Sequence, residues 1–199
     1  LVYRTSNHQK LTQVSNFFSK PIINALSEKS HPCQAISDLF TLKEKFGTLN
    51  LNILWMGDMN NVCFSLVESA NLLNELNLTI CTPQSIIKSN NWAMNENIKV
   101  VDKLTDIDLS QISCVMTDVF ISMNNDESQS KNELLQPYKV NSELMSKTSE
   151  NSVFMHCLPA KIGSEVSENV IKGKKSIVWK QAYNRLEAQK RLLSLINWQ

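Results

Sequence analysis

From residue 52 to the end of the chain, short apolar segments alternate with segments of helical pattern, and this alternation constrains the fold most strongly. A short apolar run that ends in polar groups is typical of a buried strand. The pattern predicts strands at 52–56, 78–82, 98–101, 113–119, 152–156 and 176–179. It predicts helices at 61–74, from Pro83 onward, near 106–112, at 141–148 and at 181–196. Strands that alternate with helices form a parallel sheet covered on both faces. We therefore expect an α/β fold with a doubly wound sheet over residues 47–180.

The first residues have the pattern of a strand at 1–5, a helix at 8–19 and a second strand at 21–25. Such a βαβ unit buries too little surface to fold alone. We therefore expect residues 1–31 to be the remnant of a second α/β domain whose first half is absent. Residues 32–46 then form an interdomain helix, with Pro32 in its first turn and Gly47 closing it in a left-handed conformation. Residues 181–199 are expected to form a C-terminal helix that returns toward the first domain.

Composition and charge argue against two classes of partner. The 199 residues carry a net charge of +1, which provides no broad electropositive field for a nucleic acid. No apolar stretch approaches the length that crosses a bilayer, and the first residues lack the apolar core of a signal peptide. Five cysteines without a close C-x-x-C pair argue against disulfides and a structural zinc site, and suit a reducing compartment. We expect a cytoplasmic protein.

Two motifs follow predicted strands, at the end where open α/β sheets bind ligands. His156-Cys157-Leu158-Pro159 comes directly after the apolar run Val153-Phe154-Met155 and would place a thiol in a crevice. Cysteine is also a common core residue, so this motif alone is weak. Gly57-Asp58-Met59-Asn60-Asn61 has a single glycine and lacks the G-x-G-x-x-G spacing, which disfavours NAD. His156 is expected to be structural, since no His/Cys cluster accompanies it for a metal.

Five motifs in chain order resemble those of the ornithine carbamoyltransferases, and the resemblance covers nearly the whole chain. The family pattern runs HPxQ, GDxxNN, TDVWxSM, HCLP and AENR. Here the segments are 31–34, 57–61, 117–123, 156–159 and 182–185, and the second is one residue shorter than its pattern. The resemblance implies transfer of a carbamoyl group from carbamoyl phosphate to the δ-amine of L-ornithine, giving citrulline and phosphate in arginine biosynthesis. It implies a homotrimer and no cofactor. Aspartate carbamoyltransferases are similar but have HPLP where this chain has HCLP.

The chemistry of an amine nucleophile limits where negative charge can lie. An alkylamine has a pKa near 10.4, so presenting it neutral at pH 7 costs roughly 4 to 5 kcal/mol. A carboxylate beside the δ-nitrogen would raise that pKa, so we assign Asp118 to the α-ammonium of ornithine. The resemblance adds Asn61, Ser122 and Met123 to the ornithine site. Without the motif, Asn61 would be an ordinary helix cap and Ser122 a loop residue.

The resemblance assigns the carbamoyl phosphate site to His31, Gln34, Cys157, Leu158 and Arg185. His31 would contact the carbamoyl oxygen, Gln34 the carbamoyl nitrogen, and the Leu158 carbonyl the same NH2 group. Arg185 would add a fixed cation, and each donor aimed at the developing oxyanion can supply about 3 kcal/mol. His31, Arg185 and Cys157 are thus the expected catalytic residues. Cys157 would lie against the δ-amine, either as a base or as an element of shape and polarity.

The chain departs from the family pattern at several points. The S-x-R-T phosphate motif is missing, so we expect an N-terminally truncated enzyme that is inactive by itself. Tyr183 replaces the glutamate of AENR, which could shift the helix that carries Arg185. Asn124 replaces a glycine in the polar segment 123–131, which we expect to be an irregular active-site loop, as we also expect 89–96 to be irregular. The alternatives are a non-catalytic amino-acid-binding remnant, or a carbamoyltransferase for putrescine or aspartate.

Overall fold

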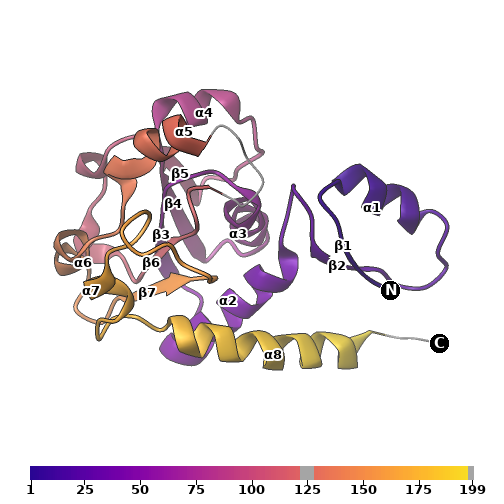
Figure 1. Cartoon of the computed structure of the whole chain (residues 1–199). Coiled ribbons are helices and arrows are strands. Elements are labelled where there is room, and N and C mark those ends of the chain that lie inside the picture. The colour runs from indigo at the N-terminus through magenta and orange to yellow at the C-terminus, as the bar shows by residue number, and fades with distance from the viewer. Residues whose placement is uncertain (122–127, 197–199) are drawn as a thin grey trace.

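The computed structural model describes residues 1–121 and 128–196. Figure 1 shows a small N-terminal unit beside a larger α/β body. In the small unit, β1 (Val2–Arg4) pairs in parallel with β2 (Ile23–Leu26), and α1 (His8–Ser15) connects them. Helix α1 ends four residues earlier than its sequence pattern predicts. It buries none of its residues, so no tertiary packing stabilises a further turn.

The larger body is built on a sheet of five parallel strands, which confirms the predicted fold class. The strands are β3 (Leu51–Met56), β4 (Leu76–Cys81), β5 (Ile98–Val101), β6 (Cys114–Thr117) and β7 (Val153–His156). Their order across the sheet is β5-β4-β3-β6-β7. The chain moves outward from β3 to β5 and then returns to the other side of β3. The order therefore reverses between β3 and β6, and ligands bind at the carboxyl ends of strands beside such a reversal.

Alternate residues of each strand enter two different cores, as the period of a strand requires. In β3, Ile53 and Trp55 pack with α2 (Pro32–Phe46) and α3 (Asn61–Leu72) on one face. Leu54 and Met56 pack on the opposite face with α6 (Ser142–Lys147), α7 (Glu168–Ile171) and the first residue of α8 (Val178–Leu195). The sheet is thus covered on both sides, which explains why its strands are apolar at nearly every position.

Helices α2 and α8 lie side by side, and α2 connects the small unit to the sheet (Figure 1). Helix α2 begins with Pro32 after His31, and Gly47 ends it with a φ of 73°, as the sequence predicts. The remaining elements are α4 (Gln84–Ser89), α5 (Ser128–Leu135) and the 3₁₀ turns Leu104–Asp106, Leu109–Gln111 and Gln136–Tyr138. Among the described residues, no helix has the length and apolar character needed to cross a membrane.

Several predicted elements are wrong. Residues 176–179 are not a strand: Ser176 forms a single bridge to Phe154, and α8 begins at Val178. A short apolar run does not distinguish a strand from the first turn of a buried helix. The helix expected near 106–112 is two 3₁₀ turns. The sequence pattern does not predict helices α5 and α7, and α5 includes residues 128–131 of the segment expected to be an irregular loop.

Candidate active site

The carboxyl ends of the three strands around the reversal supply the polar groups of the site. Residues 57–60, which end in Asn60, follow β3; Asp118 follows the end of β6, and Cys157 follows β7. Parallel pairing in register, with Thr117 opposite His156, brings the last two side by side. These positions are far apart in sequence and meet only because the strands end at the same edge of the sheet.

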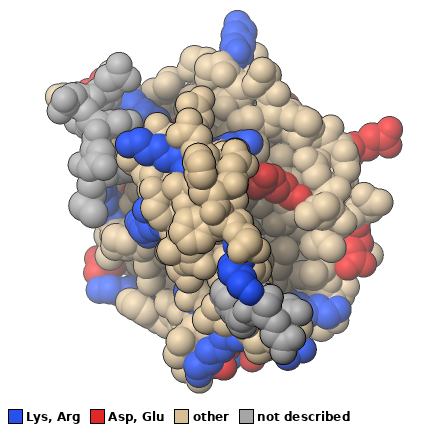
Figure 2. Space-filling view, turned by 90° about the vertical axis from the view of Figure 1, so that its right-hand side faces the viewer, with Lys and Arg blue, Asp and Glu red and all other residues tan. Residues whose placement is uncertain are grey.

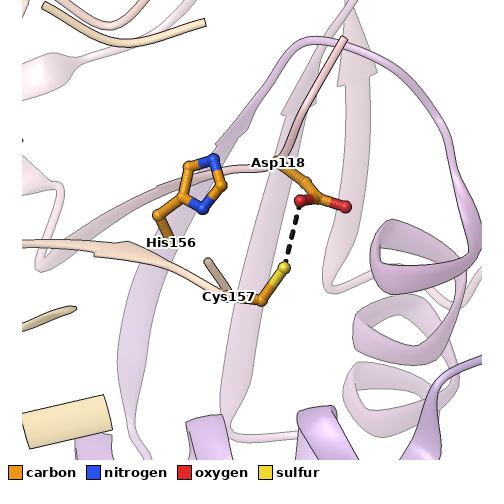
Figure 3. A group of neighbouring side chains, drawn as sticks. All are labelled: Asp118, His156 and Cys157. Atoms are coloured by element: carbon orange, nitrogen blue, oxygen red, sulfur yellow. Dashed lines mark hydrogen bonds between the residues drawn. The ribbon is translucent and has the colours of Figure 1, made fainter. Parts of the chain in front are cut away.

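Cys157 and Asp118 are in direct contact, as the dashed line in Figure 3 shows. The Sγ of Cys157 donates to Oδ1 of Asp118 at 3.0 Å. Asn60 donates from its amide to Oδ2 of the same carboxylate at 2.8 Å. The amide oxygen of Asn60 also accepts the N–H groups of Val62 and Cys63, so this residue caps α3 while it holds Asp118.

The environment of Cys157 favours the thiol over the thiolate. Burial raises the pKa of the Cys157 thiol well above its usual range, and the negative charge of Asp118 together with the hydrogen bond to it raises this pKa further. A thiolate beside an almost fully buried carboxylate would add a second negative charge to the same place. The resting site therefore holds a neutral sulfur that donates its proton toward Asp118.

His156 is fixed by contacts on both ring nitrogens. Its Nδ1 accepts the backbone N–H of Leu158 at 2.9 Å, so the proton lies on Nε2, which faces Oε1 of buried Glu165 at 3.3 Å. The candidate ligand atoms of Asp118, His156 and Cys157 lie within 4.8 Å of one another. Neither imidazole nitrogen is free to bind a metal without breaking one of these contacts. The reason given from the sequence, that no His/Cys cluster accompanies His156, is therefore wrong, because Cys157 and Asp118 lie beside it. Its two ring contacts are what favour a structural role.

The turn after Cys157 has an unusual backbone. Leu158 has a φ of 54°, and the Leu158-Pro159 peptide bond is cis. A left-handed conformation is uncommon for a leucine and persists where the surrounding contacts fix it. Here the Leu158 N–H bond to His156 provides one such contact.

A second group of side chains meets at the start of α2. Nη2 of Arg185 lies 3.3 Å from Nε2 of His31, and Nη1 of Arg185 donates to Oε1 of Gln34. Burial and the positive charges of Arg185 and Arg4 lower the pKa of His31 to about 4, so the imidazole is neutral at pH 7. Nδ1 of His31 and Nε of Arg185 are buried and have no hydrogen-bond partner within the part of the chain that the structure describes. Such groups are candidates for contact with a ligand.

A chain of hydrogen bonds connects the two groups. Gln34 and Gln181 both donate to Oδ1 of buried Asp38, at 2.8 and 2.7 Å. Gln181 then accepts the backbone N–H of His156 at 2.9 Å, directly before Cys157. The charges of Asp38 and Arg185 both act on the pKa of the Cys157 thiol, which places the two groups in one electrostatic neighbourhood.

Most predicted site residues therefore lie in one region. A few of them have contacts that differ from those predicted. Asn60, not Asn61, caps α3; Asn61 donates instead to the Ser27 carbonyl at 2.7 Å, beside the small unit. The predicted Ser122 and Met123, together with Asn124, lie outside the described residues. Tyr183 is 61% exposed, and it does not displace Arg185 from His31. On the same helix, Asn184 bonds Thr41 and Glu44 of α2, which holds α8 in place.

Sequence reasoning misses three residues of this network: Asp38, Asn60 and Gln181. Asp38 lies four residues after Gln34 and Gln181 lies four residues before Arg185, so each shares a helix face with a predicted site residue. Asn60 belongs to the motif that contains Asn61. Helical spacing from the predicted residues was therefore the available signal for Asp38 and Gln181, and the motif itself was the signal for Asn60.

The surface beyond this network carries scattered charge. Figure 2 looks at the side of the molecule that lies at the right of Figure 1. On the described part of this face, Lys and Arg side chains are interspersed with uncharged ones and do not merge into a continuous basic surface.

Known proteins match this chain along both of its parts. The model of the aspartate/ornithine carbamoyltransferase carbamoyl-P binding domain matches residues 1–44, and that of the Asp/Orn binding domain matches residues 49–196. The ornithine carbamoyltransferase of Rhizobium johnstonii is 38% identical over 200 residues, covering 98% of this chain and 65% of the relative. That of Ruthia magnifica is 40% identical over 197 residues, with 97% and 65% covered.

Solved structures give the same result. The ornithine carbamoyltransferase of Thermus thermophilus superposes with a TM-score of 0.84 at 33% identity, covering 98% of this chain and 66% of the other. The ornithine carbamoyltransferase of Pyrococcus furiosus superposes with a TM-score of 0.86 at 32% identity, covering 98% of this chain and 65% of the other. The chain thus spans about 65% of the length of the curated relatives it matches. With both domain models matched in chain order and relatives at this level of identity, the chain belongs to the aspartate/ornithine carbamoyltransferase family.

Proposed function

We propose that this protein transfers the carbamoyl group of carbamoyl phosphate to the δ-amine of L-ornithine, giving L-citrulline and phosphate. One observation carries the proposal. Arg185 and neutral His31 meet at the start of α2, and a hydrogen-bond chain connects them to Cys157 and Asp118 at the strand ends. A cation thus lies on one side of the site and a carboxylate on the other, which matches an anionic donor and an amino-acid acceptor.

On the carbamoyl phosphate side, Arg185 and His31 are the proposed contacts to the carbamoyl oxygen. As the amine attacks, negative charge grows on that oxygen, and a preorganised donor is worth about 3 kcal/mol there. Gln34 is the proposed contact to the carbamoyl NH2 group. Its own NH2 group is held by Asp38, so it can meet this donor only through its oxygen, which already accepts from Arg185 and has a second lone pair. The Leu158 carbonyl is the second proposed acceptor for the same NH2 group.

On the ornithine side, a neutral Cys157 suits the nucleophile. A thiolate would raise the pKa of the adjacent δ-amine and favour the unreactive ammonium. We therefore propose that Cys157 acts through a neutral sulfur against the amine and is not the base. Asp118 is the proposed partner of the α-ammonium, and Asn60 orients its carboxylate. Asn61, Ser122 and Met123 remain predicted ornithine contacts.

Citrulline formation by the full-length protein tests the proposal. We expect Arg185→Gln to lower kcat/KM by at least about 100-fold, because it removes a charged donor from the developing oxyanion. Arg191→Gln is the matched control, since Arg191 lies on the same helix but is exposed. Wild-type protein that forms no citrulline would refute the proposed reaction. Equal activity of the two variants would remove Arg185 from it.

We also propose that the full-length protein is a homotrimer, as the family resemblance implies. Light scattering after size-exclusion chromatography measures its mass directly, and a monomeric mass at micromolar concentration would contradict the proposal.

A further inference from the structure

Asp38 is a buried carboxylate in the middle of the interface between α2 and α8. It is 1% exposed, and no described Lys, Arg or His forms an ion pair with it. Its Oδ1 accepts the side-chain amides of Gln34, from the same helix, and Gln181, from α8. One oxygen atom therefore joins Gln34, which contacts Arg185, to Gln181, which holds the end of β7.

Stability alone does not account for a carboxylate at this position. Burial raises the pKa of Asp38 to about 7, although its bonds from Gln34 and Gln181 lower it. An apolar side chain of similar volume would avoid the desolvation of a carboxylate altogether. The carboxylate provides something that an apolar residue cannot, namely an acceptor shared by two amides.

That acceptor determines which way each amide points. A glutamine amide has a donor NH2 group at one corner and an acceptor oxygen at the other, so fixing one fixes both. With its NH2 group on Asp38, Gln34 presents its oxygen to Arg185. With its NH2 group on Asp38, Gln181 presents its oxygen to the His156 N–H. If the Gln181 amide were reversed, its NH2 group would face the His156 N–H, donor against donor. The last residue of β7 would then lose this hydrogen bond.

The His156 N–H depends on Gln181 because β7 is at the edge of the sheet. Along this edge, Phe154 pairs through its N–H with Lys175 and through its carbonyl with the N–H of Ile177. The next outward N–H, on His156, has the Gln181 side chain as its acceptor. The side chain thus extends the pairing by one residue, up to the position before Cys157.

We propose that Asp38 is a positioning residue that sets the amide orientation of Gln34 and Gln181, and so holds Arg185 and Cys157 in one site. It acts through these two residues and does not touch a substrate. This inference rests on the proposed function for its catalytic consequence, but the orientation itself is measurable without any activity.

Three variants separate orientation from packing. Asp38→Leu removes the shared acceptor, whereas Asp38→Asn keeps an oxygen that can accept both amides. Thr41→Val is the matched control, because Thr41 is also 1% exposed on α2 and accepts a bond from Asn184 of α8, outside the Asp38 network. Far-ultraviolet circular dichroism establishes that each variant is folded.

Amide hydrogen exchange at His156 is the first measurement. Loss of one ordered hydrogen bond predicts about tenfold faster exchange in Asp38→Leu, and a change within about threefold in Asp38→Asn and Thr41→Val. Gln181→Met should give the same acceleration as Asp38→Leu, and the double variant should add nothing further. Slow exchange in Asp38→Leu, additive effects in the double variant, or an equal acceleration in Thr41→Val would overturn the inference.

The side-chain NH2 resonances of Gln34 and Gln181 provide a second measurement that needs only Asp38→Asn, in case Asp38→Leu does not fold. At a pH well above the Asp38 pKa of about 7, replacing its carboxylate by an amide weakens both bonds, so both NH2 signals should shift upfield together. The exposed Gln13 serves as the internal reference. Unshifted signals for Gln34 and Gln181 would overturn the inference.

The catalytic consequence is read from steady-state kinetics of the full-length protein. Gln181→Met should lower kcat and leave the KM for carbamoyl phosphate within about twofold, because only the Cys157 side is released. Asp38→Leu should change both constants, and Asp38→Asn should restore most of the loss. Unchanged constants in Asp38→Leu would overturn the catalytic part of the inference. Wild-type protein without activity would instead refute the proposed function, and exchange at His156 would still decide the role of Asp38.

Discussion

Replacing Gly57 by alanine should damage the edge of the sheet from which the site is built. Gly57 follows β3 with a φ of 114°, a conformation that residues with a Cβ rarely adopt. A Cβ at this position would lie 2.7 Å from Cε1 and 3.3 Å from Cδ1 of Phe120. Phe120 is 1% exposed and lies two residues after Asp118, so it cannot move without disturbing the segment that carries the carboxylate.

The expected loss of stability has two parts. The backbone conformation costs an alanine about 1 to 2 kcal/mol. The contact with Phe120 adds about 1 to 3 kcal/mol, which is the usual effect of inserting a methyl group into a packed core. Gly47→Ala and Gly163→Ala are matched controls, because both glycines have a positive φ but no atom within 4 Å of the point that a Cβ would occupy. These two variants should lose only the stability that the backbone conformation costs, about 1 to 2 kcal/mol.

Urea denaturation followed by circular dichroism measures these losses. We expect the free energy of unfolding of Gly57→Ala to fall by about 2 to 5 kcal/mol, and this loss to exceed that of both controls by at least about 1 kcal/mol. A Gly57→Ala variant that loses no more than Gly47→Ala would show that Phe120 yields without cost, and the steric argument would fail.

Three further predictions concern individual site residues. Asp118→Asn should lower the pKa of Cys157 and speed its alkylation by iodoacetamide at pH 8. Asp108→Asn, on the exposed surface, should not change the rate. An unchanged rate in Asp118→Asn would mean that burial alone sets the reactivity of Cys157. Because the pKa of His31 falls from 6.5 to about 4 on folding, wild type should lose stability as the pH falls through that range. Between pH 7 and 4.5, the free energy of unfolding of wild type should fall by about 2 to 3 kcal/mol more than that of His31→Asn, as measured by urea titrations. The same pH dependence in both proteins would contradict this prediction. Asn60→Ala should cost about 1 to 2 kcal/mol through loss of the α3 cap, while Asn60→Ser should retain most of that stability but weaken ornithine binding in calorimetry. Equal stability of the two Asn60 variants would mean that the cap contributes little.

The sequence predicted the parallel sheet because its signal is local. Strand and helix periods are properties of neighbouring residues, and each apolar strand is followed by its own motif. The bounds of α2 were also predictable, since Pro32 and Gly47 impose backbone angles whatever surrounds them. The short helices α5 and α7 were not predicted, because a helix of one or two turns carries too few residues for a period.

The convergence of His31, Gln34 and Arg185 on one place was expected from motif order and is present in the structure. What only the tertiary structure decided is the set of contacts between distant segments. Asp38 and Gln181 are 143 positions apart, and no local pattern pairs them. The neutral Cys157 thiol and neutral His31 likewise depend on burial and on charges brought from other elements. Sequence thus determined which groups are present at the ends of which strands, whereas folding determined their partners and protonation states, because hydrogen bonds and desolvation depend on spatial neighbours.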